Sequence, residues 1–511
     1  MKAETHFVAG DFCIETQPDP CCIAIFGASG DLTSRKLIPA LCNLYKRNLL
    51  PEKFYMLGCA RTKMSDDEFR AHLQESLSEH CRDLAAEQAC EFLSRCYYMN
   101  GDYNDIQLYE SLKNRMSDLD STHETGGNHI FYLAIPPNLL EQVVAMLRKV
   151  KLTSGCKGGA CVRVIVEKPF GKDPASAHSL DKRLRKALDE HQIYRIDHYL
   201  GKETVQNIMM FRFANTIFEP IWNHEYVDHV QITAAESIGV GHRAGYYEQT
   251  GVVRDMFQNH MLQMLSLVAM EPPASFDADA VRDEKVKLLK SIRPFERNDL
   301  SSYVARGQYL VGEVGDEGVV GYHEEEGVAS DSSVDTYAAM KLMIDNKRWK
   351  GVPFYLRSGK RLAKRMSEIA IVFKQTTGTT FDKVFPHRLP PDMLVLNVQP
   401  EEGVSLTIQA KHPGPKLCMG SLTMNFKYRE DLKVELSDAY ERLLLDCMLG
   451  DQTLFVRSDG MEMGWKLIAP IIESWYNDGA HGEIPIYPAG SWGPKEADQL
   501  IERDGRKWRN S

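Results

Sequence analysis

Short apolar runs alternate with stretches of helical periodicity over roughly the first two hundred residues. The apolar runs are CCIAIFGAS from position 21, KFYMLGCAR from 53, NHIFYLAIPP from 128 and CVRVIVEKPFG from 161. Strands that alternate with helices are typical of a parallel sheet covered on both faces. We therefore predict a doubly wound, Rossmann-type sheet in a first domain, residues 1–199, with ligands bound at the carboxyl ends of its strands.

The pattern changes after about residue 200. One helical segment, KETVQNIMMFRFAN, precedes strand-like runs such as VDHVQITAAES, EIAIVFKQ, MLVLNVQP, GVSLTIQAK and SLTMNFKY. Successive strands with turn residues between them indicate antiparallel pairing. The second domain, residues 200–511, is thus predicted to be α+β, with a large, mostly antiparallel sheet and helices on one face. The acidic, glycine-containing segment 312–327 is predicted to be a mobile surface loop.

Composition narrows the class of protein. The chain has 511 residues and a formal net charge of −10, so no basic surface attracts nucleic acid or an anionic membrane. The N-terminus lacks the basic region of a signal peptide, and no apolar run approaches the ~20 residues that span a bilayer. The twelve cysteines form no C-x-x-C pair, which favours reduced core residues over a disulfide framework or a zinc site. We expect a cytoplasmic protein that needs no metal.

A glycine turn ends the first apolar run, in IAIFGASGDLTSRK. Gly27 and Gly30 stand where a dinucleotide fingerprint has glycine, but Ser29 and Leu32 occupy the other two glycine positions. This spacing alone is equally compatible with a phosphate-binding turn and with an ordinary strand–helix turn. The second run ends in Arg61 with no acid beside it, which favours NADP over NAD, because a cation accommodates the 2′-phosphate.

Two further positions suggest catalysis. Lys168 directly precedes Pro169, which disfavours helical geometry and would direct the lysine into the crevice. His260 lies in the helix-like run VVRDMFQNHMLQMLSLV. A rim lysine and a core histidine remain the alternative interpretations of these two residues.

RIDHYLGKE, residues 195–203, joins an acid, an imidazole, a phenol and two cations in nine positions. Together with GASGDLTSRKLIPAL, EKPFGKD and GVVRDMFQNHMLQ, this motif closely resembles the glucose-6-phosphate dehydrogenase family, and the match runs in order through nearly the whole chain. The resemblance implies oxidation of β-D-glucose 6-phosphate at C1 by NADP to 6-phosphogluconolactone, the first oxidative step of the pentose phosphate pathway.

The resemblance also implies roles for individual residues. His260 matches the family's general base, and Asp197 matches the acid that orients it. The residues that match substrate-binding positions are Lys168, His198, Tyr199, Lys202, Glu236, Asp255 and Lys360. Those that match the cofactor site are Gly27, Ser29, Gly30, Asp31, Leu32, Lys36, Arg61 and Lys168, and Pro169 matches a proline that sets the cofactor position.

Animal members of the family hold a second, structural NADP. At the positions aligned with that site this chain has Asn397 and Ser405 to Thr407 in place of the family's residues, so we predict that the second NADP is absent. The resemblance implies a homodimer or homotetramer built through the large sheet.

Two competing interpretations are weaker. A shorter two-domain sugar dehydrogenase would lack the combination of RIDHYLGKE and QNH. A non-catalytic NADP-binding sensor would be expected to lose Asp197 or His260, and both are present.

Overall fold

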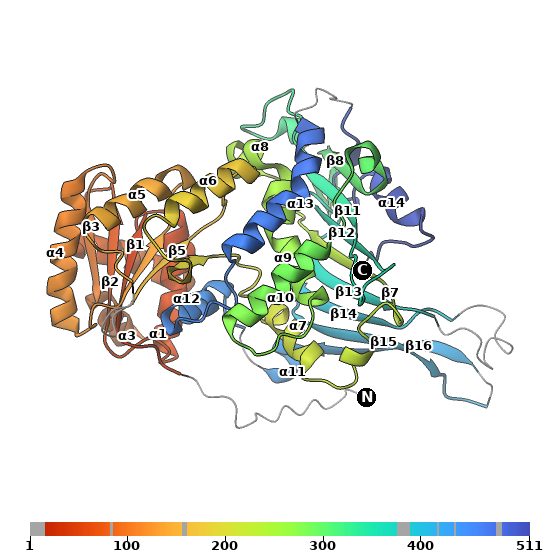
Figure 1. Ribbon diagram of the computed structural model, residues 1–511, viewed down its shortest axis with the longest axis horizontal. Coiled ribbons are helices and arrows are strands. Elements are labelled where there is room, and N and C mark those ends of the chain that lie inside the picture. Colours follow the sequence, from red (N-terminus) through yellow and green to blue (C-terminus); the bar gives the residue numbers. More distant parts are fainter. Residues whose placement is uncertain are drawn as a thin grey trace.

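The computed structural model describes residues 16–81, 85–155, 161–375, 389–415, 418–433, 436–476 and 483–510. Two sheets organise the chain, with several helices between them (Figure 1). The predicted fold class is confirmed in both halves.

The first sheet has six strands in the order β3-β2-β1-β4-β5-β6, all parallel. The strands are β1 (Cys21–Phe26), β2 (Phe54–Ala60), β3 (Cys96–Asn100), β4 (His129–Leu133), β5 (Val162–Val166) and β6 (Ile193–Arg195). Every residue of β1 and β2 is buried, as expected of strands covered on both faces. The strand order reverses between β1 and β4, and this switch point is where such sheets bind ligands.

Helices pack in two groups, one made by α1 to α3 and the other by α4 to α6. Their bounds are η1 (Thr33–Leu37), α1 (Ile38–Lys46), α2 (Asp66–His80), α3 (Ala86–Ser94), α4 (Ile106–His123), α5 (Pro137–Lys149), α6 (Pro174–Leu184) and η2 (Glu190–Gln192). The α6 helix begins with Asp173 as its N-cap and Pro174 at its first position. Between the second and third predicted strands the chain forms α2, α3, β3 and α4, and the sequence analysis did not predict β3.

The second sheet has nine strands in the order β16-β15-β14-β13-β7-β12-β11-β8-β17. They are β7 (Val227–Ala235), β8 (Val304–Leu310), β11 (Tyr337–Met343), β12 (Pro353–Gly359), β13 (Met366–Phe373), β14 (Met393–Gln399), β15 (Gly403–Lys411), β16 (Met419–Lys427) and β17 (Ile486–Pro488). Only β7–β12 and β8–β17 pair in parallel, so the sheet is mostly antiparallel, as predicted.

Most of the helices of the second half lie on the side of this sheet that faces the first one (Figure 1). The longer ones are α7 (Glu203–Phe213), α8 (Ala244–Val252), the π-helix η5 (Val253–Met261), α9 (Leu262–Ala269), α10 (Ala278–Ser291), α12 (Ala439–Leu449), α13 (Ser458–Tyr476) and α14 (Lys495–Glu502). The short ones are η3 (Glu219–Ile221), η4 (Gly241–Arg243), η6 (Arg297–Ser302), η7 (Tyr322–Glu324) and α11 (Tyr428–Leu432). None of the helices in the described ranges is long and apolar enough to cross a membrane.

The acidic segment 312–327 is more ordered than predicted. It contains a small hairpin, β9 (Gly312–Val314) with β10 (Glu317–Val319), followed by η7. Glu325 is buried and accepts hydrogen bonds from the Tyr309 hydroxyl at 2.7 Å and the Gly241 amide at 2.8 Å. These contacts attach the segment to the body of the protein. The segment lies at the surface, as predicted, but forms a hairpin and a short helix rather than a loop, and its mobility stays a prediction.

Most described cysteines are free and several are buried in the core, in agreement with the sequence analysis. Cys161 is an exception, because it is disulfide-bonded. The expectation of uniformly reduced cysteines therefore fails at this position.

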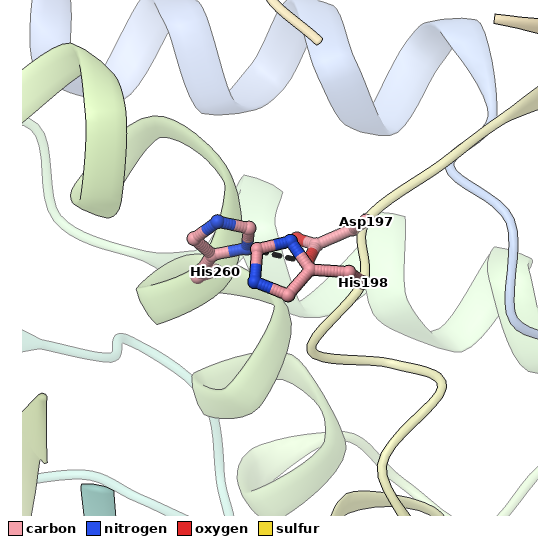
Figure 2. A group of neighbouring side chains, drawn as sticks. All are labelled: Asp197, His198 and His260. Carbon is pink, nitrogen blue, oxygen red and sulfur yellow. Dashed lines mark hydrogen bonds and ion pairs between the residues drawn. The ribbon is translucent and has the colours of Figure 1, made fainter. Parts of the chain in front are cut away.

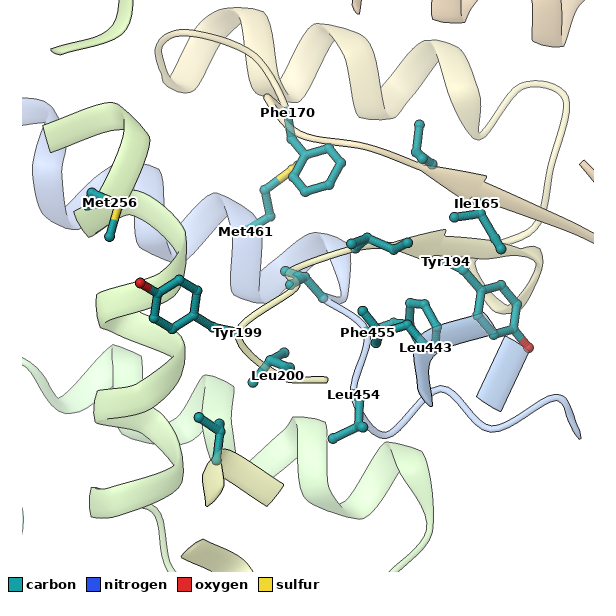
Figure 3. Packing of buried hydrophobic residues seen from close by; sticks show 14 of the residues in the cluster. Ile165, Phe170, Tyr194, Tyr199, Leu200, Met256, Leu443, Leu454, Phe455 and Met461 are labelled. Carbon is teal, nitrogen blue, oxygen red and sulfur yellow. The ribbon is translucent and has the colours of Figure 1, made fainter. Parts of the chain in front are cut away.

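The segment 436–476 returns from the second sheet to the first. Its helix α12 contacts α1, Val456 bridges to Arg195 at the end of β6, and the ring of Phe455 meets that of Tyr194 edge-on at 4.7 Å. Figure 3 shows Leu443, Leu454 and Phe455 beside Tyr194 and Leu200. This packing holds the chain where RIDHYLGKE leaves the first sheet. The predicted boundary between the first and second domains, at residue 199, remains a prediction.

Candidate active site

The predicted site residues converge between the two sheets. Asp197 to Lys202 follow β6, Lys168 follows β5, Asp255 and His260 lie on η5, Glu236 follows β7, and Lys360 follows β12. The carboxyl ends of parallel strands point to the same edge of the sheet, so β5 and β6 deliver their residues to one crevice. The second domain supplies the facing residues.

A buried Asp–His pair, Asp197 and His260, lies among these residues (Figure 2). The His260 Nδ1–H donates to Asp197 Oδ1, and both side chains are 1% exposed. The Tyr199 amide donates to the same carboxylate oxygen at 3.0 Å, and the Tyr199 ring stacks on the imidazole with centroids 4.4 Å apart. The hydrogen bonds and the stacking together fix the plane and the tautomer of His260.

Burial and neighbouring charges set the ionisation of this pair. Burial would raise the pKa of Asp197, but the adjacent His260 imidazole and its hydrogen bond lower it to about 2. Burial and the nearby Lys168 lower the pKa of His260, although Asp197 opposes this effect. At neutral pH the pair therefore consists of a carboxylate and a neutral imidazole.

Lys168 occupies the other side of the imidazole. Its Nζ donates to His260 Nε2 at 2.7 Å and to the Asp255 carboxylate at 3.1 Å. Because Nδ1 carries the ring proton toward Asp197, Nε2 holds the free lone pair. The Lys168–Pro169 peptide is cis. The sequence analysis did not foresee that the lysine and the histidine, 92 positions apart, would contact each other.

The π-helical geometry of η5 explains how Asp255 and His260 meet the same lysine. In an α-helix, residues five positions apart point in different directions, whereas the i→i+5 bonds of a π-helix bring them to one face. Asp255 also accepts from the Tyr246 hydroxyl at 3.3 Å. Burial would raise the pKa of Asp255, but Lys168, Arg243 and Lys360 hold it well below its usual range.

An open cavity of about 990 Å³ adjoins the Asp–His pair and is lined by His198, Lys202, Arg365 and Gln399, among others. Burial lowers the pKa of Lys202 to about 8 and that of His198 well below its ordinary value. The Lys202 ammonium donates to Gln399 Oε1 and lies 4.8 Å from the centre of the Tyr199 ring. Lys202, Arg365, His198 and Gln399 thus supply cations and neutral donors that suit an anion. The cavity is also lined by acids, namely Glu401, Glu402, Glu430 and Asp438, so the anion would be bound beside the first group.

Arg365 and Gln399 were not among the predicted site residues. Neither stands in a motif with a chemical pattern, and Gln399 reaches the cavity only because β14 lies in the interior of the second sheet. Their role depends on tertiary placement.

Glu236 and Lys360 form a second pair at the edge of the crevice. Lys360 Nζ donates to Glu236 Oε2 at 2.6 Å, and the ammonium lies 5.1 Å from the centre of the Tyr247 ring. Lys360 also lowers the pKa of Asp255, which connects this pair electrostatically to the Lys168 side. In this arrangement the carboxylates can accept hydrogen bonds from hydroxyl groups, and the ammonium can donate hydrogen bonds to them.

The glycine turn after β1 has the features of a dinucleotide site. Gly27 has a φ of +87°, and a Cβ there would lie 2.1 Å from the Ala134 carbonyl oxygen, so only glycine fits. The hydroxyl of Ser29 lies 3.1 Å from that of Thr62 in the loop after β2. Arg61, beside it, is exposed. A helix N-terminus, hydroxyl groups and an arginine suit a pyrophosphate and a nucleotide phosphate, so these residues fit the predicted cofactor.

The remaining cofactor candidates lie around this turn. Asp31 pairs with Arg35 at 2.8 Å on the surface, and Leu32 lines the cavity. Lys36 also lines it and pairs with Asp438 at 2.8 Å. This last contact joins the first domain to the segment that returns from the second.

Asp197, His198 and His260 also form the one group in the described ranges whose ligand atoms lie close enough to hold a metal, within 4.8 Å of one another. However, Nδ1 of His260 donates to Asp197, and Nε2 faces the Lys168 ammonium, which repels a cation. The absence of a metal requirement stays a prediction.

A doubly wound parallel sheet with a glycine turn, facing a buried Asp–His pair across a crevice, defines a two-domain dehydrogenase that uses a nicotinamide cofactor. Comparison with family models shows which family of dehydrogenases the chain belongs to. Residues 24–207 match the glucose-6-phosphate dehydrogenase NAD binding domain, and residues 209–509 match the C-terminal domain of the same family. The chain belongs to the glucose-6-phosphate dehydrogenase family.

Individual relatives agree with this assignment. The chain is 46% identical over 495 residues to glucose-6-phosphate 1-dehydrogenase of Chlamydia pneumoniae, covering 96% of each chain. It is 44% identical to glucose-6-phosphate 1-dehydrogenase 2 of Mycobacterium tuberculosis H37Rv, covering 96% of this chain and 94% of the relative. A solved glucose-6-phosphate dehydrogenase in complex with its substrate glucose-6-phosphate matches with a TM-score of 0.88 and 36% identity, over 97% of this chain and 100% of the other.

Proposed function

We propose that this protein oxidises β-D-glucose 6-phosphate at C1 to 6-phosphogluconolactone, with transfer of the hydride to NADP, as the first oxidative step of the pentose phosphate pathway. The observation that carries the proposal is the buried Asp197–His260 pair. The unprotonated Nε2 of His260 accepts a hydrogen bond from Lys168, and the cavity that contains Lys202 and Arg365 adjoins the pair. Family membership supplies the substrate and the reaction.

His260 acts as the general base. Its low pKa leaves Nε2 unprotonated at neutral pH, and the C1 hydroxyl takes the position on Nε2 that the Lys168 ammonium holds. Lys168 remains near the substrate through Asp255. As the C1–O–H proton moves to Nε2, the Asp197 carboxylate stabilises the resulting imidazolium.

The residues around the cavity bind the phosphate. Lys202 and Arg365 supply positive charge, and His198 and Gln399 supply neutral donors. A phosphate carries two negative charges and several acceptor oxygens, so it benefits from both kinds of group. Glu236, Asp255 and Lys360 are placed to bind the sugar hydroxyls.

When bound, the nicotinamide accepts the hydride that leaves C1. The turn at Gly27, the hydroxyls of Ser29 and Thr62, and Lys36 would hold the dinucleotide, and Arg61 would bind the 2′-phosphate that distinguishes NADP from NAD. The choice of NADP is part of this proposal.

We also propose a homodimer or homotetramer in the cytoplasm. The outer strand β16 presents Leu422 and Met424 at 49% and 46% exposure on the edge of the large sheet. Apolar side chains on an edge strand favour association with a second copy. Sedimentation at micromolar concentration, compared between the wild type and L422E, tests this part independently.

The experiment that tests the function follows reduced nicotinamide by absorbance. The purified protein should reduce NADP rapidly with glucose 6-phosphate and slowly with glucose, because glucose lacks the group that the cavity binds. His260→Asn should bind substrate but lose most turnover, whereas His178→Asn, at an exposed ion pair with Glu462, should retain it. Equal rates with both sugars would contradict the assignment of the phosphate site, and near-normal kcat in H260N would contradict the general base.

A further inference from the structure

Ser367 is hydrogen-bonded to the cavity residue Gln399 but is itself buried. It lies on β13 with 1% of its surface exposed, and Gln399 is its partner on the neighbouring strand β14. The register between the two strands shifts beside this pair. The next pair is Glu368 with Asn397, which leaves Val398 as an extra residue on β14. A β-bulge of this kind redirects side chains and is common next to active sites.

The Gln399 amide connects this serine to Lys202. The lysine carries only N–H donors, so it must meet the carbonyl oxygen of the amide, and its Nζ donates to Gln399 Oε1. The NH₂ group then faces the other way, where one of its two N–H bonds donates to Ser367 Oγ at 2.9 Å. Because an amide has one acceptor end and one donor end, the serine oxygen fixes which end points at the ammonium.

The same hydroxyl also contacts the tyrosine that stacks on the proposed base. Ser367 Oγ lies 3.4 Å from the Tyr199 hydroxyl oxygen, and the Tyr199 ring stacks on the His260 imidazole with centroids 4.4 Å apart. Since Ser367 Oγ accepts from Gln399, its own hydrogen is available to the Tyr199 oxygen. This contact is longer than the bond from Gln399 and therefore weaker. The main effect of Ser367 is thus on the Lys202 side.

We propose that Ser367 is a positioning residue for phosphate binding: it holds the Gln399 amide with its oxygen toward Lys202 and thereby keeps the ammonium in one place in the cavity. The inference rests on the proposed function, which assigns the substrate phosphate to this cavity. A lysine that is held before the substrate arrives loses less rotamer freedom on binding, so it binds an anion more tightly. Ser367 acts through Gln399 and does not contact the phosphate.

Removal of the hydroxyl has a defined consequence. In Ser367→Ala the NH₂ group of Gln399 loses its nearest acceptor, and a buried donor without a partner is unfavourable. The alternative orientation is no better, because it turns the NH₂ group toward an ammonium that can only donate. Lys202 consequently loses its fixed acceptor, whereas the Asp197–His260 pair keeps its own hydrogen bond. Phosphate affinity should therefore fall more than turnover.

The first test compares the phosphorylated with the unphosphorylated sugar. In Ser367→Ala, KM for glucose 6-phosphate should rise about three- to tenfold, the range of one lost hydrogen bond, with kcat within about twofold of the wild type. The value of kcat/KM for glucose, which has no phosphate, should stay unchanged. Ser367→Thr keeps the hydroxyl and should retain most of the affinity.

Ser266 provides the matched control. It is fully buried on α9, and its hydroxyl donates to the Leu262 carbonyl of the same helix at 2.6 Å. Ser266→Ala therefore removes a buried hydroxyl that does not line the cavity, and both KM and kcat should match the wild type. A rise in KM equal to that of S367A would show that loss of any buried hydroxyl has this effect and would overturn the inference.

A double-mutant cycle with Lys202 separates positioning from support of the fold. In a K202M background, S367A should raise KM no further, because no ammonium remains for the amide to orient. If S367A raises KM by the same factor in K202M as in the wild type, Ser367 acts independently of Lys202 and the inference fails.

Titration with inorganic phosphate, without sugar or nicotinamide, separates the inference from the proposed function. Calorimetry should give a higher Kd for phosphate in S367A than in the wild type, by about the same factor as KM. This result supports the inference even if the assigned reaction fails. If the wild type reduces NADP with glucose 6-phosphate but S367A matches it in both KM and phosphate Kd, the proposed function stands and the role of Ser367 is refuted.

Discussion

Asp197→Asn is the substitution that tests the proposed base most sharply. It keeps the volume of the side chain and removes its charge. Asp197 Oδ1 accepts from both His260 Nδ1 and the Tyr199 amide, so an asparagine oxygen in its place can still accept both, while the NH₂ group would replace Oδ2, which is buried without a partner. The variant therefore removes the charge that stabilises the imidazolium and buries an NH₂ group without an acceptor.

The structure sets a lower limit for the effect. The pKa of Asp197 is about 2 against an ordinary value of 3.8, although burial acts in the other direction. At about 1.4 kcal/mol per pH unit, this difference corresponds to about 2 kcal/mol of interaction that favours the carboxylate, mainly from His260. The pair is fully buried, so solvent screening does not reduce the figure. If the imidazolium of the transition state loses this amount, kcat falls ~30-fold.

An amide flipped so that its NH₂ group faced His260 Nδ1 would add the loss of the tautomer to this number. In the Ser-His-Asp triad of serine proteases, the corresponding change lowers kcat by about 10⁴. We therefore expect kcat of D197N to lie about 30-fold to 10⁴-fold below the wild type, with KM for glucose 6-phosphate changed by less than about fivefold, since His198, Lys202 and Arg365 are untouched. Initial rates of nicotinamide reduction over a range of substrate concentrations measure both constants.

A matched control exists in the first domain. Asp120 accepts from His129 Nε2 at 2.8 Å, the same kind of pair outside the crevice. Asp120→Asn should lower the melting temperature and leave kcat unchanged. The reasoning about Asp197 is refuted if folded D197N keeps kcat within about fivefold of the wild type, or if D120N lowers kcat as much as D197N does.

Four further predictions concern other parts of the molecule. Arg61→Ala should raise Kd for NADP far more than Kd for NAD in fluorescence titrations; an equal increase would remove Arg61 from the 2′-phosphate site. Gly27→Ala should destabilise the protein by more than about 2 kcal/mol in urea unfolding, because its Cβ would lie 2.1 Å from a carbonyl oxygen; an unchanged midpoint would contradict this geometry. Lys202, with a pKa of about 8, should lose its charge as pH rises through 8, so KM for the phosphorylated sugar should increase there and this increase should be absent in K202M. Burial raises the pKa of Asp335 from 3.8 to about 6, so the folded state binds the proton more tightly than the unfolded state does. The free energy of unfolding should therefore fall by about 3 kcal/mol as pH rises from about 4 to 6. Urea unfolding at each pH measures this loss, and D335N should lack it.

Some of the fold was readable from local pattern. The buried strands of the first sheet are continuous apolar runs, and α6 begins with Asp173 as its N-cap and Pro174 as its first residue. By contrast, β3 was missed, because its sequence CYYMN follows an amphipathic helix without a turn signal. The hairpin and short helix within the acidic segment 312–327 were missed, because composition does not show that Glu325 would be buried against Tyr309.

Some residues of the candidate site could likewise be predicted from the sequence, and others could not. The motifs identified most of its residues, but through resemblance to a family, since a lone histidine or lysine carries little information by itself. Arg365 and Gln399 stand in no recognisable pattern and are identified only because they line the cavity beside the Asp–His pair. Lys168 can donate to both His260 and Asp255 because a π-helical turn brings these two residues to one face. The run GVVRDMFQNHMLQ gives no local signal for that turn.

The sequence by itself determined the two-part architecture, the glycine turn and the residue types available for proton transfer and anion binding. These features depend on residues close together in the chain, where hydrophobic period and backbone sterics act directly. Only the tertiary structure decided which of those residues meet, what their pKa values are and which cations face Asp197. The physical reason is that burial and charge interactions are set by groups from distant segments, here β5, β6 and η5, whose distances the local pattern does not specify.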